Sequence, residues 1–227
     1  MRKYIFYLIS VLLAASSISA TVIHIPTDYA TIQQGIDASY HGDTVLVKPG
    51  EYVENVSIAY KNIVLASHFL TTGDTSYIPI TIIDGDSSGY VIQLNSVDSN
   101  TAVTGFTIRN GYNFLGSGAG ISCVYSGSPV ISYNIIEDNN FNCVYYERGG
   151  GGIGCYYSSP IIENNTIINN TVDNFGWGGG IFCLYSSATI KNNIISDNIA
   201  CWGGGIGFYD SDPIIINNLI YENDADP

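Results

Sequence analysis

A unit of 25 to 32 residues recurs four times in the second half of this 227-residue chain. Each copy opens with glycines followed by isoleucine and continues into the pattern Ile-x-x-Asn-x-Ile-x-x-Asn. The opening glycines are Gly120, Gly152, Gly180 and Gly205. The paired asparagines are Asn134/Asn139, Asn165/Asn170, Asn193/Asn198 and Asn218/Asn223. Self-similarity at such a period indicates a solenoid, in which each repeat buries its apolar face against its neighbours.

Each copy has a part of fixed length and a part of variable length. The first Asn follows the glycine by 14 residues in the first copy and by 13 in the others, whereas successive copies start 32, 28 and 25 residues apart. The extra residues lie around 140–149, 171–177 and 199–202. Loops of changing length on a constant core are typical of stacked coils.

The fixed part has the pattern of short β-strands. Apolar residues alternate with a period of two, as at Ile153/Cys155, and Pro129, Pro160 and Pro213 fall between the expected strands. We therefore predict an all-β, single-stranded parallel β-helix with three strands per coil and roughly seven coils. Equivalent residues then stack in columns, and one inward column consists of Ile121, Ile153, Ile181 and Ile206.

Stacking gives the repeated polar and sulfur residues structural roles. An Asn at a corner donates to and accepts from identical neighbours, which is how Asn165, Asn193 and Asn218 are interpreted. Three of the five cysteines share one repeat position and are expected to form a reduced interior stack: Cys123, Cys155 and Cys183. The only histidines, at 24, 41 and 68, lie too far upstream to complete a metal site there.

The N-terminal region predicts export and a cap. Residues 1–20 have a basic start, an apolar run from Ile5 to Leu13 and small residues before the cleavage point, which indicates a signal peptide. The alternative is an uncleaved anchor helix, although the apolar run is shorter than the ~20 residues of a bilayer span. Residues 21–40 are expected to form a strand and a capping helix over 27–38, capped by Thr27 or Asp28. The β-helix then occupies 41–227.

The chain is strongly acidic. Its formal charge is −13, and a mature chain without residues 1–20 keeps five basic and all 20 acidic residues, which gives −15. Such a charge repels nucleic acid and anionic lipid. A polyanionic glycan is repelled as well unless calcium bridges the two surfaces.

Several segments resemble known right-handed β-helix proteins of the pectin-lyase-like kind. The segment TIQQGIDASYHGDTVLVKPGEYVENVSI (31–58) resembles the opening of pectin-methylesterase-like proteins, and TIIDGD (81–86) and VTGFTIRNG (103–111) resemble their following coils. The Gly-Gly-Gly-Ile and Ile-x-x-Asn units resemble repeats of polymorphic outer-membrane proteins. The resemblance covers essentially the whole mature chain and implies a right-handed β-helix, but it does not fix an activity.

The catalytic signatures of these families are absent or incomplete. Pectinesterases of this kind are expected to use two aspartates, an arginine and glutamines, yet Arg109 has no paired aspartates in its own coil. The Asn-Thr-Asp, Asp-Asp, Gly-His-Gly and Arg-Ile-Lys motifs of polygalacturonases are missing. The carboxylates Glu137, Asp138 and Asp197 near the variable loops leave glycoside hydrolysis open.

No cofactor is expected except calcium. Oxygen-rich Asp-x-Asp pairs suit this hard cation, and two are present, Asp84/Asp86 and Asp210/Asp212. The alternative is a polar turn, which is the more common role of such a pair.

Aromatic residues near the glycines are the candidates for glycan binding. Trp177 and Trp202 lie 25 residues apart, one coil, and Tyr145, Tyr146 and Phe175 fall in the adjacent variable loops. The triple glycines are expected to leave bare backbone and a shallow trough beside them. The alternative is that both indoles only shield the glycine backbone.

Two classes of function follow. The first is an exported or cell-surface β-helix that binds carbohydrate or another surface as an adhesive module. The alternative is a polysaccharide lyase or hydrolase. The chain ends directly after an Asn signature without a cap, so we expect a piece of a longer polypeptide.

Overall fold

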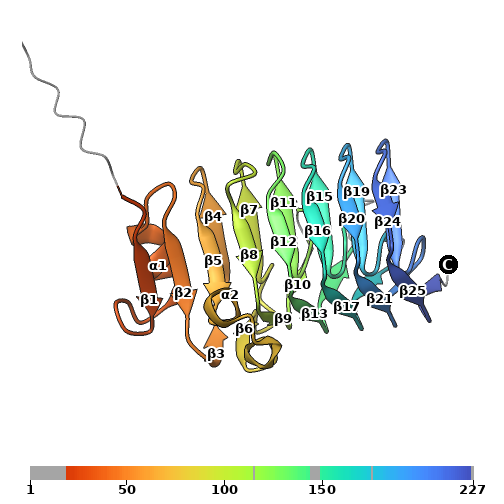
Figure 1. Cartoon of the computed structure of the whole chain (residues 1–227). Helices are drawn as coiled ribbons and strands as arrows, with labels where there is room; N and C mark the ends of the chain where they lie inside the picture. The colour runs from red at the N-terminus through yellow and green to blue at the C-terminus, as the bar shows by residue number, and fades with distance from the viewer. Residues whose placement is uncertain (1–18, 115, 144–148, 175, 226–227) are drawn as a thin grey trace, which may run out of the picture.

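A computed structural model describes residues 19–114, 116–143, 149–174 and 176–225. In these residues the chain winds as a parallel β-solenoid whose coils stack along one axis (Figure 1). Four parallel sheets run along this axis, with eight, seven, six and five strands, and together they make about six turns. The β-helix prediction is confirmed, with slightly fewer turns than the roughly seven expected.

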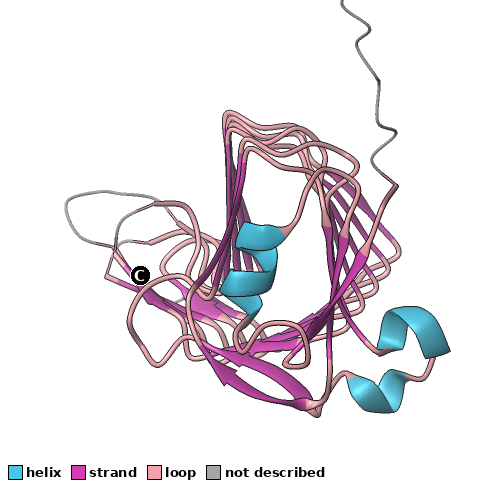
Figure 2. Cartoon of the chain, turned by 90° about the vertical axis from the view of Figure 1, so that its left-hand side faces the viewer, coloured by secondary structure: helices cyan, strands magenta, loops and turns pink. Residues whose placement is uncertain are grey.

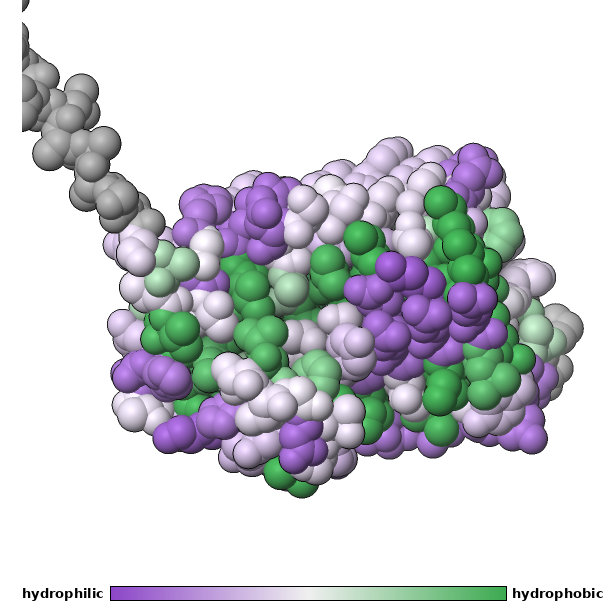
Figure 3. Space-filling view, viewed as in Figure 1, coloured by the Kyte–Doolittle hydropathy of each residue, from purple (hydrophilic) through white to green (hydrophobic). Residues whose placement is uncertain are grey.

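Sheet A is the longest wall and includes the N-terminal strand of the described chain. Its strands in spatial order are β1 (Val22–Ile25), β2 (Thr44–Val47), β5 (Val64–Ser67), β8 (Ala102–Thr104), β12 (Val130–Ser132), β16 (Ile161–Glu163), β20 (Thr189–Lys191) and β24 (Ile214–Ile216). The middle residue of each short strand points inward, and Val103, Ile131, Ile162 and Ile190 form a fully buried column. Figure 3 shows apolar and polar areas side by side on the surface of the molecule. On the outer face of sheet A, Lys191 pairs with Glu163 at 2.9 Å.

Sheet B follows sheet A around each coil. It consists of β3 (Gly50–Val53), β6 (Thr81–Asp84), β9 (Thr107–Arg109), β13 (Ile135–Glu137), β17 (Thr166–Ile168), β21 (Ile194–Ser196) and β25 (Leu219–Tyr221). Its buried column contains Ile83, Ile108, Ile136, Ile167 and Ile195. The last residue of each strand points outward, because successive side chains of a strand alternate between the two faces.

Sheet C carries the predicted isoleucine and cysteine columns. It consists of β4 (Val56–Ala59), β7 (Ile92–Asn95), β11 (Ile121–Val124), β15 (Ile153–Tyr156), β19 (Ile181–Leu184) and β23 (Ile206–Tyr209). Ile121, Ile153, Ile181 and Ile206 are register partners, as predicted, and so are Cys123, Cys155 and Cys183. The five cysteines are free and buried, which confirms the reduced stack.

A fourth sheet, which the sequence did not predict, lies just after the second Asn of each repeat. Sheet D consists of β10 (Tyr112–Asn113), β14 (Asn140–Asn142), β18 (Thr171–Asp173), β22 (Ile199–Ala200) and β26 (Asp224–Ala225). The residues of β14, β18 and β22 belong to the segments expected to be loops. They pair instead because Phe141, Val172 and Ala200 build a second small core with Ala119 and Cys143.

Two ladders of asparagines hold successive coils together at the corners on either side of sheet B. In one ladder Asn134, Asn165, Asn193 and Asn218 follow one another, and the other contains Asn139, Asn170, Asn198 and Asn223. Within a ladder each asparagine donates its backbone N–H and its side-chain amide to the side-chain oxygen of the next asparagine, and each amide also donates to backbone carbonyls. The structural interpretation of these residues is thereby confirmed.

A helix, α1 (Ile32–Ala38), lies across the N-terminal end of the solenoid and buries Ile32 and Ile36 (Figure 2). The capping helix is confirmed, but its predicted start is wrong. The side chain of Thr31 caps it by accepting from Gln34, whereas Asp28 accepts the backbone N–H of His24 in a separate turn.

Two further helical segments, α2 (Phe69–Thr72) and η1 (Thr75–Tyr77), interrupt the coil between sheets A and B. The sequence patterns did not predict either of them. No helix in the described part of the chain is long and apolar enough to span a membrane.

Candidate functional site

Trp177 and Trp202 lie side by side on neighbouring coils, as the one-coil spacing predicts. They form an isolated parallel bridge, and their ring centroids are 5.2 Å apart. Trp177 also approaches Phe182 at 6.2 Å and Tyr209 at 6.1 Å, both on the outer face of sheet C. Trp202 is 43% exposed. We refer to Trp177, Trp202 and Tyr209 as the tryptophan surface, which packs on the fully buried Phe182.

The glycines after each tryptophan fix this arrangement, but they open no trough. Gly178 and Gly203 adopt positive φ angles of 68° and 66°, which glycine allows without steric cost. Gly179 and Gly180 are buried, and a Cβ on either would collide with the carbonyl oxygen of the equivalent glycine in the next coil. The predicted bare backbone is therefore wrong, because neighbouring coils pack directly onto these glycines.

A second aromatic group borders sheet C at the turn toward sheet A. Tyr125, Tyr157 and Tyr185 follow β11, β15 and β19, and we call them the tyrosine ladder. Tyr157 stacks on Tyr125 at 6.0 Å and on Tyr185 at 4.8 Å, with interplanar angles of 10° and 18°. Tyr156 packs edge-on against Tyr157 at 4.6 Å.

A recurring tyrosine in the sequence indicates the ladder. Tyrosine recurs two residues after each stacked cysteine, in Cys-Val-Tyr-Ser, Cys-Tyr-Tyr-Ser and Cys-Leu-Tyr-Ser. The spacings of 32 and 28 residues equal those of the glycines. By contrast, the candidates Tyr145, Tyr146 and Phe175 lie outside the described residues.

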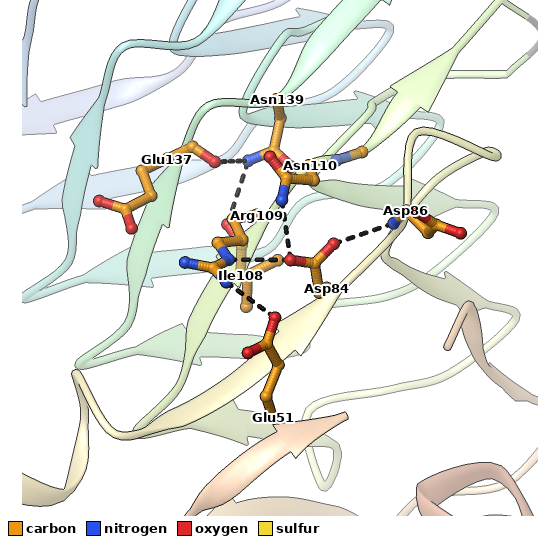
Figure 4. A network of polar contacts seen from close by, with 9 residues as sticks. Glu51, Asp84, Asp86, Ile108, Arg109, Asn110, Glu137 and Asn139 are labelled. Atoms are coloured by element: carbon orange, nitrogen blue, oxygen red, sulfur yellow. Dashed lines mark hydrogen bonds and ion pairs between the residues drawn. The ribbon is translucent and has the colours of Figure 1, made fainter. Parts of the chain in front are cut away.

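A charged cluster occupies the outer face of sheet B at its N-terminal end (Figure 4). Arg109 donates through Nε to Asp84 at 2.9 Å and through its terminal nitrogen to Glu51 at 2.9 Å. Asn110 donates to the same Asp84 oxygen at 2.7 Å. Asp84, Arg109 and Glu137 are register neighbours on β6, β9 and β13, so an arginine lies between two carboxyl groups.

The two carboxyl groups beside Arg109 have opposite pKa shifts. Partial burial acts to raise the pKa of Asp84, but the backbone N–H of Asp86 and the side chain of Arg109 hold this pKa below its usual range. Burial raises the pKa of Glu137, and the charge of Asp138 adds to the rise, against a lowering by Arg109. The two carboxyl groups beside Arg109 therefore differ in acidity, with Asp84 the stronger acid and Glu137 the weaker.

The sequence motifs did not predict this cluster, because its members lie in different coils. Arg109 has no aspartate partner within its own coil, as expected, but Asp84 precedes it by 25 residues and is its direct neighbour in space. Applying the coil spacing to charged residues as well as to glycines identifies the pair.

Comparison with known proteins identifies the fold family. The family described as "Right handed beta helix region" matches residues 53–225. The chain belongs to this family. No curated protein sequence is significantly similar to this β-helix protein.

Solved structures that resemble this β-helix protein include pectin methylesterases. One mutant enzyme in complex with a hexasaccharide shares 15% identity over 94% of this chain and 69% of its own, with a TM-score of 0.48. A second hexasaccharide complex shares 13% identity over 79% and 66%, with a TM-score of 0.43. The enzyme from Aspergillus niger shares 17% over 93% and 88%, with a TM-score of 0.40.

The two predicted calcium pairs differ in how their carboxylates are used. Both oxygens of Asp84 already accept hydrogen bonds, one from Asp86 and the other from Arg109 and Asn110. A cation at Asp84 has to displace a guanidinium. Asp210 and Asp212 are exposed, and no cluster of three or more His, Cys, Asp or Glu suited to a metal occurs among the described residues. Calcium at Asp210 and Asp212 stays a prediction.

The buried cysteines are unsuited to metal binding or nucleophilic chemistry. Hydrogen bonding to Cys123 together with complete burial raises the pKa of the Cys155 thiol well above its usual range, and contact with Cys155 does the same for Cys183. Because the thiolate is the reactive form, both residues act as small apolar side chains.

Proposed function

We propose that this protein is an exported β-helix that binds a neutral carbohydrate through the tryptophan surface. The observation that supports this most directly is the pair of indoles on adjacent coils, 5.2 Å apart, one of them 43% exposed. Flat amphipathic rings at a surface suit stacking against the apolar faces of sugar rings.

Charge favours a neutral glycan over a polyanion. The formal charge is −13, and every lysine and arginine among the described residues already contacts the protein's own oxygen atoms. Lys48 donates to Thr27, Lys61 to the last carbonyls of α1, Arg109 to Asp84 and Glu51, and Lys191 pairs with Glu163. A uronate polymer therefore finds no uncommitted cation on this part of the molecule.

Export is part of the same proposal. The sequence of residues 1–20 supports a cleaved signal peptide, although residues 1–18 lie outside the described part of the chain. Burial of all five free thiols keeps them away from oxidants, which suits a disulfide-free protein in an oxidising compartment. N-terminal sequencing of protein recovered from the medium of an expressing host tests cleavage after Ala20.

Carbohydrate binding is tested with the double variant Trp177→Ala/Trp202→Ala on a panel of neutral and acidic glycans. Tyr40→Ala is the control, because Tyr40 is 65% exposed and lies beside the N-terminal helix, away from the tryptophans. Circular dichroism first establishes that each variant is folded. We expect binding of a neutral glycan by the parent and the control and loss of binding by the double variant. The proposal fails if the double variant binds like the parent or if the parent binds nothing.

The alternative function is a polysaccharide lyase or hydrolase, and one observation favours it. Asp84 and Glu137 flank Arg109 on alternate coils, and their pKa values move in opposite directions. Asp84 and Glu137 are two strand spacings apart, so their backbones lie ~10 Å from each other. At this spacing their side chains can reach the separation that the two carboxyl groups of inverting glycosidases have. Product release from the same glycan panel, with and without calcium, tests it, and Glu137→Gln must abolish any activity found.

A further inference from the structure

The turn that follows each strand of sheet C has the same backbone conformation in every described coil. Its first residue has a positive φ between 45° and 56° and is Tyr60, Ser96, Tyr125, Tyr157, Tyr185 or Asp210. This left-handed conformation favours glycine, asparagine and aspartate and is disfavoured for bulky side chains.

Two other corners of the coil obey this preference more closely. Where sheet A leads into sheet B, the left-handed residues are Gly105, Asn164, Asn192 and Asn217, with Tyr133 as a single bulky exception, and after sheet B they include Asn110, Asp138, Asn169, Asp197 and Glu222. Three consecutive tyrosines at the sheet C turn therefore run against the local backbone preference. A backbone strain that the fold retains at three successive tyrosines indicates that their side chains have a function.

The tyrosines of the ladder are also exposed. The exposed fractions are 62% for Tyr125, 49% for Tyr157 and 43% for Tyr185. The rings cover one another's faces, so the ladder presents a row of ring edges and phenol groups to solvent, one per coil, along the solenoid axis. The row itself contains no charged side chain until Asp210 at the next coil.

The ladder and the tryptophan surface border the same face of the molecule. Tyr156 and Tyr209 occupy the same outward register position of sheet C, on β15 and β23, with Leu184 between them. Tyr156 packs against the ladder, and Tyr209 packs against Trp177. Tyr156, Leu184 and Tyr209 therefore form a continuous row of large side chains across the outer side of sheet C, from one aromatic group to the other.

We propose that the tyrosine ladder is a second contact surface for the glycan, and that this glycan is a linear neutral polysaccharide lying along the solenoid axis. The proposal rests on the carbohydrate binding proposed above and specifies its ligand. The ladder repeats every 4.8 to 6.0 Å, close to the advance of one sugar residue in an extended chain. Phenol groups donate and accept hydrogen bonds, which matches the hydroxyl groups of an uncharged sugar.

Tyr157→Asn is the informative variant, because asparagine suits the left-handed backbone. Tyr60→Asn is the matched control: Tyr60 has the same turn position and φ of 56°, and Ser96 separates it from the ladder. Tyr185→Asn serves as a second ladder variant. Binding is measured by titration calorimetry with cello-, manno- and malto-oligosaccharides of two and six residues, after melting temperatures have shown that all variants are folded.

We expect the parent to bind a hexasaccharide of at least one series more tightly than its disaccharide. Tyr157→Asn and Tyr185→Asn should weaken hexasaccharide binding roughly fivefold or more and leave disaccharide binding unchanged, with no effect of Tyr60→Asn. If both ladder variants bind hexasaccharides like the parent while Trp177→Ala/Trp202→Ala does not, the ladder proposal is wrong and the tryptophan proposal stands. A folded parent that binds none of these sugars overturns both.

Discussion

The side-chain oxygen of Asn193 accepts two hydrogen bonds from Asn165, one from its backbone N–H at 2.9 Å and one from its amide at 3.0 Å. Asn193 then donates to Ile162, to Lys191 and to Asn218. One buried side chain thus links three consecutive coils, and the same arrangement recurs along both ladders. Each coil is held by polar contacts at its corners and by apolar columns along its walls.

Replacing Asn193 by alanine should lower the free energy of unfolding by ~1–3 kcal/mol, because buried partners in two neighbouring coils lose their hydrogen bonds. Urea titration followed by circular dichroism measures the change. Asn100→Ala at an exposed turn is the control and should stay within about 0.5 kcal/mol of the parent. Equal effects of both changes would contradict the role of the ladder.

Ile181→Ala should cost ~2–5 kcal/mol, since Ile153 and Ile206 on either side are fixed by their own coils and cannot close the cavity. Ile214→Ala provides a comparison in the same kind of strand, because Ile214 is 54% exposed. Guanidinium titrations should show a much smaller loss for Ile214→Ala. A loss at Ile181 no greater than that at Ile214 would mean that the column is not the core.

Asp84 should make stability fall in acid. Its pKa is lower in the folded state, so its stabilising contribution is present above the unfolded value of ~3.9 and is lost as the pH falls through the lower folded value. Asp84→Asn should therefore reduce the melting temperature at pH 7, and the difference from the parent should shrink below about pH 3. A constant difference from pH 7 to pH 2 would refute the ionic contribution.

Glu137 should have the opposite effect. The pKa of Glu137 is raised in the folded state, so ionisation of this carboxyl group opposes folding. The stability that the protonated group contributes is fully present below its unfolded pKa of ~4.3 and is lost as the pH rises through its folded pKa. Glu137→Gln should raise the melting temperature at pH 7 and leave it nearly unchanged at about pH 3. Glu163→Gln, at the ion pair with Lys191, is the control and should not stabilise the protein at pH 7.

Repetition explains which features were predictable. The columns at Ile181 and Cys155 and the ladder at Asn193 recur at fixed distances, so any one copy indicates the position of the others. Arg109 and Asp84 are not part of a repeated pattern. Their contact can be predicted only by asking which residue of a different type lies one coil length away in the sequence. The true start of α1 at Ile32 depends on Glu54 in the connection between β3 and β4, whose carboxylate accepts the backbone N–H groups of Ile32 and Gln33, 22 and 21 residues away in the sequence. Local sequence rules contain no such partner.

The two corner ladders flank sheet B, whereas the segments of variable length lie beyond sheet D. The asparagine ladders therefore fix the register between neighbouring coils before the chain enters the variable loop. The buried glycines restore this register after the loop ends. Coils separated by 32, 28 and 25 residues consequently share one interior. Evolution can lengthen, shorten or exchange these loops without redesigning the core, so new surface chemistry is acquired by editing a few residues at a time while the scaffold is inherited unchanged.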